Sequence, residues 1–151
     1  MCMEALLTNK PLISAFIAVV SAQVLKTIFN FFIIGKIDIK RMANTGGMPS
    51  SHAATVSALS TSIGMIHGID SADFAVSLVF SIVVIYDAVG VRRAAGRHAE
   101  VLNEWSTILS EIYKHGIQPA NLKTLLGHTY PQILAGAVLG IFIGSLITTY
   151  S

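Results

Sequence analysis

The sequence predicts an all-α membrane protein: a polytopic bundle of about four transmembrane helices, with one more amphipathic helix at the membrane interface. Of its 151 residues, 53% are hydrophobic and only 12% are charged, whereas charged residues make up about a quarter of a soluble domain. The hydrophobic residues also gather in runs close to the roughly 20 residues that a helix needs to cross a bilayer. We therefore expect a single membrane-embedded domain over residues 1–151.

Four apolar runs are the candidate spans. They are Leu12 to Ile34, Ala53 to Ile69, Phe74 to Val91 and the uncharged stretch that follows Lys123. The first run holds one charged residue, Lys26, the third holds only Asp87, and the second holds none. The first run is too long for a removable signal peptide and lacks a small-residue cleavage site, so we expect it to remain as a span.

A further helix is expected between the third and fourth spans. From Ala94 to Tyr113, hydrophobic residues recur at three- and four-residue spacing, with charged residues opposite them. Trp105 lies on this apolar stripe, and Trp is favoured in the headgroup zone of a membrane. We therefore expect the helix to lie along the interface. His98 is on the same stripe, and we expect it to be packed rather than functional.

The positive charges gather on one side of the expected bundle. If four helices span, the connections at 35–52 and 92–130 lie on the same membrane face. Eight of the ten Lys and Arg residues fall there: Lys36, Lys40, Arg41, Arg92, Arg93, Arg97, Lys114 and Lys123. Short loops rich in Lys and Arg stay in the cytoplasm, so we expect this face to be cytoplasmic and the chain to lie in the plasma (inner) membrane of a bacterium. For any one of these residues, setting the topology is the expected role.

The residues 45 to 52, Thr-Gly-Gly-Met-Pro-Ser-Ser-His, open the second run and have the features of an anion site. Pro is favoured at the first helical position, Ser supplies capping oxygens, and the glycines let backbone N–H groups approach a ligand. Unpaired N–H groups and the helix dipole favour negative charge there, and His52 adds a proton donor or acceptor. An ordinary capped helix start explains these residues equally well.

A second helix start points to the same face. Gly127-His128-Thr-Tyr-Pro-Gln132 leads into the fourth run, with its proline suited to the first helical turn. Three glycines then recur every four residues, at Gly136, Gly140 and Gly144, a spacing typical of close helix packing. Two helix N-termini, two histidines and the basic residues therefore converge on one membrane face.

The two charged residues inside the spans need partners or a polar cavity, because an isolated charge in a membrane is costly. Lys26 shares a helix face with Gln23 and Asn30, so this polar stripe is expected to face the bundle interior. Asp87 lies about one turn before Arg92 and Arg93. For Asp87, an ion pair with Lys26 or with one of these arginines is favoured over a catalytic role.

These motifs resemble the divergent bacterial and plant branch of the type 2 phosphatidic acid phosphatase and vanadium haloperoxidase superfamily. The resemblance runs from about Gln23 to the C-terminus and is best at residues 46–52, 86–93 and 127–136. It implies that His128 is a phosphate-attacking nucleophile and that His52 is the acid of a Pro-Ser-Gly-His-like motif, with Ser51 in place of its glycine. It further implies phosphate binding by Lys26, Arg41 and the Ser50 to His52 backbone.

The chain departs from the superfamily pattern at two positions. The arginine expected six residues before the nucleophile falls at Leu122, so Arg92 or Arg93 would have to bind phosphate in its place. The acid that orients the nucleophile falls at Gln132. An amide oxygen accepts the imidazole N–H but carries no charge to stabilise an imidazolium.

The expected function is hydrolysis of a lipid or polyprenyl phosphate or diphosphate through a phosphohistidine. We expect His128, His52, Gln132 and Asp87 to be catalytic, with no cofactor, no metal and no nucleic-acid partner. Two other readings stay open: a non-catalytic protein that binds anionic lipid headgroups or a partner through its basic face, and a transporter that uses Lys26 and Asp87. Assembly into a homo-oligomer is compatible with the sequence.

Overall fold

Every regular element in the described part of the chain is an α-helix. The computed structural model describes residues 2–34, 47–112, 122–124 and 126–150. Its helices are α1 (Cys2–Leu7), α2 (Lys10–Ile34), α4 (Ser51–His67), α5 (Ala72–Val89), α6 (Val91–Ile112) and α7 (Tyr130–Tyr150). The predicted all-α membrane fold is confirmed, and the helices begin and end within a few residues of the expected runs.

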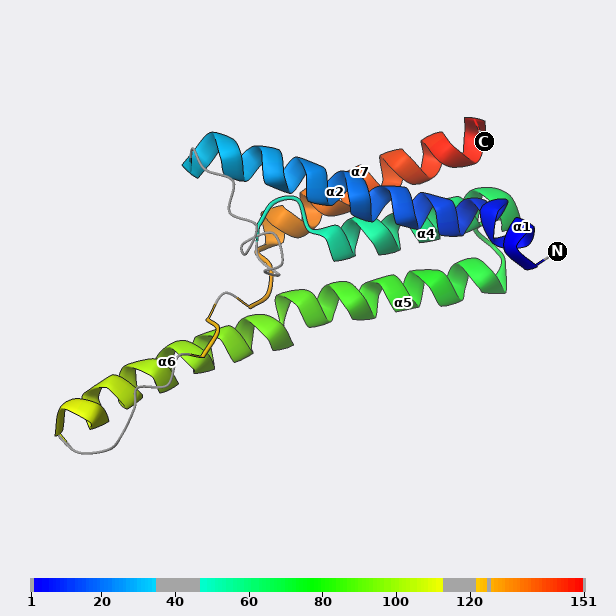
Figure 1. Cartoon of the computed structure of the whole chain (residues 1–151). Coiled ribbons are helices and arrows are strands. Elements are labelled where there is room, and N and C mark those ends of the chain that lie inside the picture. Colours follow the sequence, from blue (N-terminus) through cyan, green and yellow to red (C-terminus); the bar gives the residue numbers. More distant parts are fainter. Residues whose placement is uncertain (1, 35–46, 113–121, 125, 151) are drawn as a thin grey trace.

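Helices α2, α4, α5 and α7 form an up-and-down bundle (Figure 1). Helices α2 and α5 run in one direction, and α4 and α7 run in the opposite direction. One end of the bundle therefore gathers the beginnings of α4 and α7 with the ends of α2 and α5. The chain termini lie near the opposite end. The two basic connections therefore join helix ends that lie at the same end of the bundle, as the sequence predicts.

Three stretches of the described chain are long and apolar enough to cross a membrane. They are Lys10–Phe32, the combined α5 and α6 stretch Ala72–Ile112, and Tyr130–Tyr150. The second predicted span corresponds to α4, which has 17 residues and is at the short end of the range for a membrane helix.

The small residues of α4 suit its central position. This helix packs against α2, α5 and α7, and Ala54, Ala58 and Ser62 on it are buried. Large apolar side chains such as Phe80 and Val83 are exposed on α5 instead. Because protein rather than lipid surrounds α4, its sequence favours close packing over hydrophobicity.

The glycines of α7 bring its backbone against α4. A β-carbon at Gly136 would collide with the carbonyl oxygen of Ser50, and one at Gly144 would lie 2.7 Å from the carbonyl oxygen of Ala58. Gly140 makes the same kind of approach between them. The predicted packing role of these glycines is confirmed, and the contact at Ser50 fixes the start of α7 beside the start of α4.

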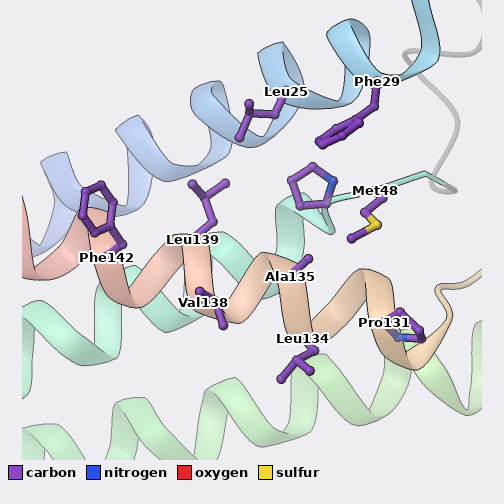
Figure 2. A pocket seen from close by; sticks show the side chains of 10 residues that line it. Leu25, Phe29, Met48, Pro131, Leu134, Ala135, Val138, Leu139 and Phe142 are labelled. Carbon is purple, nitrogen blue, oxygen red and sulfur yellow. The ribbon is translucent and has the colours of Figure 1, made fainter. Parts of the chain in front are cut away.

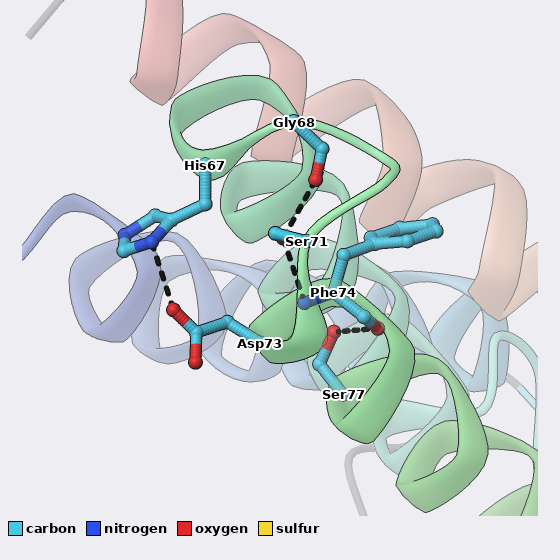
Figure 3. Close-up of polar contacts among 6 residues, drawn as sticks. All are labelled: His67, Gly68, Ser71, Asp73, Phe74 and Ser77. Carbon is cyan, nitrogen blue, oxygen red and sulfur yellow. Dashed lines mark hydrogen bonds and ion pairs between the residues drawn. The ribbon is translucent and has the colours of Figure 1, made fainter.

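The turn between α4 and α5 closes the opposite end of the bundle (Figure 3). The Ser71 hydroxyl donates to the carbonyl oxygen of Gly68 at 2.7 Å and accepts the N–H of Phe74 at 3.2 Å. Nδ1 of His67 and Oδ2 of Asp73 lie 2.9 Å apart across the turn. These contacts keep α4 and α5 antiparallel.

Helix α6 follows α5 in nearly the same direction and projects beyond the bundle (Figure 1). It has the expected amphipathic pattern, and Leu102 and Trp105 are exposed on it. Gly96 is buried where the carbonyl oxygen of Thr124 packs against it. The helix is confirmed, and its position along a membrane interface stays a prediction. His98 is exposed, so the expectation that it is packed is wrong.

Candidate functional site

His52 and His128 lie next to each other at the end of the bundle where α4 and α7 begin. Their ring centroids are 6.2 Å apart and the ring planes are inclined by 59°. His52 is exposed in the first turn of α4. His128 lies two residues before the start of α7, and only 4% of it is exposed. The two imidazoles therefore share one site, as the sequence predicts, and their catalytic roles stay predictions.

The junction between α5 and α6 holds the backbone of His128. The His128 N–H donates to the carbonyl oxygen of Ala88 at 3.0 Å. Gly127 has φ +87°, and a β-carbon there would lie 2.7 Å from the backbone nitrogen of Arg93. Only glycine allows this conformation and this close approach without strain. Backbone packing therefore explains the glycine that precedes His128 in the sequence motif.

Asn103 of α6 anchors the segment that leads to His128. Its side-chain amide donates to the carbonyl oxygen of Leu122 and accepts the N–H of Leu122, both at 2.9 Å. Leu122, at the position where the superfamily pattern has an arginine, thus contributes its backbone. The sequence analysis missed Asn103, because a single Asn on an amphipathic helix carries no spacing signal.

Gln132 fixes the tautomer of His128. Its Oε1 atom accepts the N–H of Thr129 at 3.1 Å and lies 3.3 Å from Nδ1 of His128. Because Oε1 can only accept, Nδ1 carries the ring proton and Nε2 keeps its lone pair. Nε2 is buried, and no hydrogen-bond partner for it lies among the described residues. His128 therefore presents an unpaired ring nitrogen of the kind a nucleophile needs.

The surroundings of His128 favour its neutral form. Burial lowers the pKa of its imidazole below the ordinary value, and the charges of Lys26 and Arg92 act in the same direction. The hydrogen bond with Gln132 raises the pKa and so opposes them in part. Since burial disfavours the charged form of a histidine, the lone pair on Nε2 stays available at neutral pH.

Ser50 organises the beginning of α4. It is the N-cap, and its hydroxyl accepts a backbone N–H of the first turn at 3.4 Å. Its own N–H donates to the carbonyl oxygen of Gln132 at 2.9 Å. These contacts correct the sequence analysis in two respects: Pro49 precedes the cap rather than opening the helix, and the N–H of Ser50 is used within the fold. The N–H groups of Ser51 and His52 are then the donors that an anion would use.

Lys26 reaches the site from α2. Only 4% of it is exposed, so the prediction that its polar stripe faces the interior agrees with the structure. Its side-chain stem packs on Gly47, where a β-carbon would lie 2.6 Å from Cε. Gly47 also has φ +116°, a conformation that other residues rarely adopt. The backbone conformation therefore favours glycine here, and a β-carbon would displace the end of the lysine side chain.

Asp87 and Arg92 form an ion pair at the α5–α6 junction. The distance from Oδ2 to Nε is 2.7 Å, and the side chains are 38% and 44% exposed. The structural pairing that the sequence favoured for Asp87 is therefore present, with Arg92 as a partner. Arg93 has an exposed side chain, and its backbone contacts Gly127. Arg41, predicted to bind phosphate, lies outside the described residues.

The chemical groups at this site suit an anion. A buried lysine, an arginine, two helix N-termini and two imidazoles lie at one end of the bundle, and such groups bind phosphate through charge and N–H donors. Among the described residues, no three His, Cys, Asp or Glu side chains gather as metal ligands would.

The sequence matches a known family over most of its length. The sequence model of the family described as "Divergent PAP2 family" matches residues 7–143. An uncharacterized membrane protein of Bacillus subtilis (strain 168), YuiD, is 39% identical over 154 residues, which cover 96% of this chain and 97% of that protein. No solved structure matches the chain. The family match includes every residue of the site, from Lys26 to Gln132.

Proposed function

Because the chain belongs to the Divergent PAP2 family, we propose that it is a membrane phosphatase that hydrolyses a lipid or polyprenyl phosphate or diphosphate. Its helices of spanning length and its membrane-protein relative make it an integral membrane protein. One observation carries the proposal: Nε2 of the buried His128, which has no hydrogen-bond partner among the described residues, lies beside a second imidazole, that of His52, next to a buried lysine.

In the first step, Nε2 of His128 attacks phosphorus in line with the leaving oxygen. The new N–P bond gives a phosphohistidine as the P–O bond breaks, and the leaving oxygen takes a proton from His52. Gln132 accepts the Nδ1–H throughout and keeps the ring oriented. Nε2 is covered in this structure, so the substrate must displace the side chains over it before the attack.

In the second step, the neutral His52 takes a proton from water, and the water oxygen attacks phosphorus. The N–P bond breaks, inorganic phosphate leaves, and His128 regains its lone pair. Lys26, Arg92 and the N–H groups of Ser51 and His52 stabilise the negative oxygens around phosphorus, where phosphoryl transfer needs most help.

The remaining predicted residues have supporting roles in this scheme. Ser50 shapes the start of α4, and Asp87 holds Arg92 through their ion pair. Arg93 and Arg41 are further phosphate ligands suggested by the sequence. The bias of Lys and Arg toward the sequence segments 35–52 and 92–130 supports a site that faces the cytoplasm of a bacterium from its plasma membrane.

The test is release of inorganic phosphate from lipid phosphates by the purified protein in detergent. We expect His128→Ala to lower kcat by about 10³-fold or more, and His52→Ala by about 10²-fold or more. His98→Ala, at an exposed histidine of α6, is the matched control and keeps the wild-type rate. With wild type, an acid-labile phosphohistidine at His128 should be trapped on rapid quenching.

Equal rates in wild type and both site variants over a broad substrate panel would refute this proposal. The alternative is then a non-catalytic protein that binds anionic lipid headgroups at the same site. The uncharged Gln132, in place of an orienting acid, is the observation that favours it.

A further inference from the structure

An apolar groove lies between α2 and α7, beside the site (Figure 2). Its volume is about 680 Å³, within the range of ligand-binding pockets. Leu25 and Phe29 of α2 form one wall, and Ala135 and Leu139 of α7 form the other. Met48 closes the groove on the side of the loop that leads to α4. All the side chains that line it are apolar.

The groove and the phosphate site share the same three segments of chain. In each segment one residue lines the groove and the next belongs to the polar site. These pairs are Leu25 with Lys26, Pro49 with Ser50, and Pro131 with Gln132. A ligand that fills the groove and reaches its polar end therefore arrives at the cationic and imidazole groups.

Several side chains that line the groove are themselves exposed on the outer face of the bundle. Phe29, Val138 and Phe142 are 47%, 60% and 62% exposed. This face belongs to helices of membrane-spanning length, so the groove is reached from the bilayer. An apolar chain enters it without leaving a hydrocarbon environment, and its polar headgroup stays at the end of the bundle.

Resting on the proposed function, we propose that the groove between α2 and α7 binds the apolar chain of the substrate while His128 faces its phosphate. The substrate is then one amphiphile, with a phosphate attached to an apolar chain, that enters sideways from the membrane. The walls carry no charged or hydroxyl side chain, so the groove selects chains by length and shape. The recognition of phosphate rests with the polar end.

The first experiment blocks the groove. Ala135→Trp puts a large ring between the walls, and Ile141→Trp puts the same ring on an exposed position of α7 that does not line the groove. We expect Ala135→Trp to lower kcat/KM for farnesyl phosphate or dodecyl phosphate by about 10-fold or more. Hydrolysis of p-nitrophenyl phosphate, which has no chain, should stay within about 2-fold of wild type. Ile141→Trp should change neither rate. A loss on long-chain substrates that Ile141→Trp reproduces would overturn the proposal.

The second experiment uses the wild-type protein and needs no turnover. A dodecyl phosphate with a photoreactive diazirine in the middle of its chain is irradiated with the protein, and the labelled peptides are mapped. Labelling of peptides that contain Phe29, Met48 or Leu139, reduced by orthovanadate, supports the proposal. Labelling mainly on α5 overturns it. Equal labelling of the groove by the corresponding alcohol also overturns it, because the groove would then hold any bilayer chain.

The two proposals fail in different ways. Absence of phosphate release from every substrate would refute the hydrolysis, whereas labelling of the groove would still report binding of a phosphate amphiphile. Conversely, hydrolysis without groove labelling would leave the phosphatase standing and refute the groove.

Discussion

The amide oxygen of Gln132 lies 3.3 Å from Nδ1 of His128 and 3.1 Å from the backbone nitrogen of Thr129. The Thr129 N–H can only donate, so it determines which end of the amide faces the imidazole. The first turn of α7 thus holds His128 in one tautomer without a carboxylate. An amide leaves a positive imidazole less stabilised than a carboxylate would, and we therefore expect chemistry at His128 to be slow.

Replacement of Gln132 tests this orientation. Gln132→Ala removes the acceptor at Nδ1, so we expect kcat to fall by about 10- to 100-fold, the range found when a hydrogen-bond partner that orients a metal-binding histidine is removed. Gln132→Glu supplies a negative charge, which raises the pKa of His128 and favours its protonated form. Phosphate release gives the rates, and ¹⁵N NMR of labelled histidine gives the tautomer. A wild-type rate and an unchanged tautomer in Gln132→Ala would contradict the orienting role.

The lowered pKa of His128 sets the acidic side of the pH dependence that we expect for the site. Burial disfavours the imidazolium, so the neutral nucleophile persists below the usual histidine pKa of about 6.5. We expect the rate that depends on His128 to decline only as the pH falls further. An NMR titration of the His128 ring should give a midpoint below about 6.5, and a midpoint above it would contradict the structure.

The same shift has a consequence for folding stability. Because the pKa is lower in the folded state, the unfolded chain takes up the proton first as the pH falls. The stability contributed by His128 is complete above the unfolded pKa of about 6.5 and is lost progressively below it, down to the folded pKa. His128→Asn should flatten this part of the curve of Tm against pH.

Gly47 and Gly68 both have a positive φ. A comparison of alanine variants at the two positions distinguishes the effect of backbone strain from the effect of displacing Lys26. Gly47 (φ +116°) packs against Lys26, whereas Gly68 (φ +88°) lies in the α4–α5 turn. An alanine at either position is strained by about 1–3 kcal/mol, because residues with a β-carbon rarely adopt these backbone angles. We expect both variants to lose stability, and only Gly47→Ala to displace the lysine and weaken inhibition by orthovanadate.

The comparison is made by thermal unfolding and by orthovanadate titration of phosphate release. Gly68→Ala is the control because Gly68 also has a positive φ and lies at the far end of the bundle. Equal inhibition constants in the two variants would show that Lys26 does not depend on Gly47.

The sequence predicted the elements whose cause is local. Long apolar runs predict α2, α5 and α7, because a lipid-facing helix needs such a run whatever its neighbours are. The four-residue glycine spacing predicts the packing face of α7, because small residues on one side of a helix let a neighbouring helix approach closely. The expected topology placed the two helix starts, with His52 and His128, on one membrane face, and the family resemblance then assigned both histidines to one site.

Contacts between distant segments of the chain could not be predicted from the sequence. The bonds of Asn103 to Leu122 and of Ser50 to Gln132 depend on how α4, α6 and α7 lie in space. The direction of α6 also depends on the residues that join it to α5. Pattern arguments place such residues on a helix face, whereas their partners follow only from the fold.

The ion pair of Asp87 and Arg92 permits a decisive test of the role of Asp87. Both side chains are partly exposed, and pairs of this kind contribute about 0–1 kcal/mol to stability. If Asp87 acts only by holding Arg92, then Asp87→Asn and Arg92→Gln lower kcat/KM by similar small factors, and the double variant is no worse than either.

If Asp87 is itself catalytic, Asp87→Asn alone lowers kcat by about 10²-fold or more. In that case the loss persists in the Arg92→Gln background. The double-mutant cycle, measured by phosphate release with Tm as a check on folding, separates these outcomes. The partial exposure of the pair favours the first, since a carboxylate that contacted the reacting groups would be expected in the buried space around His128.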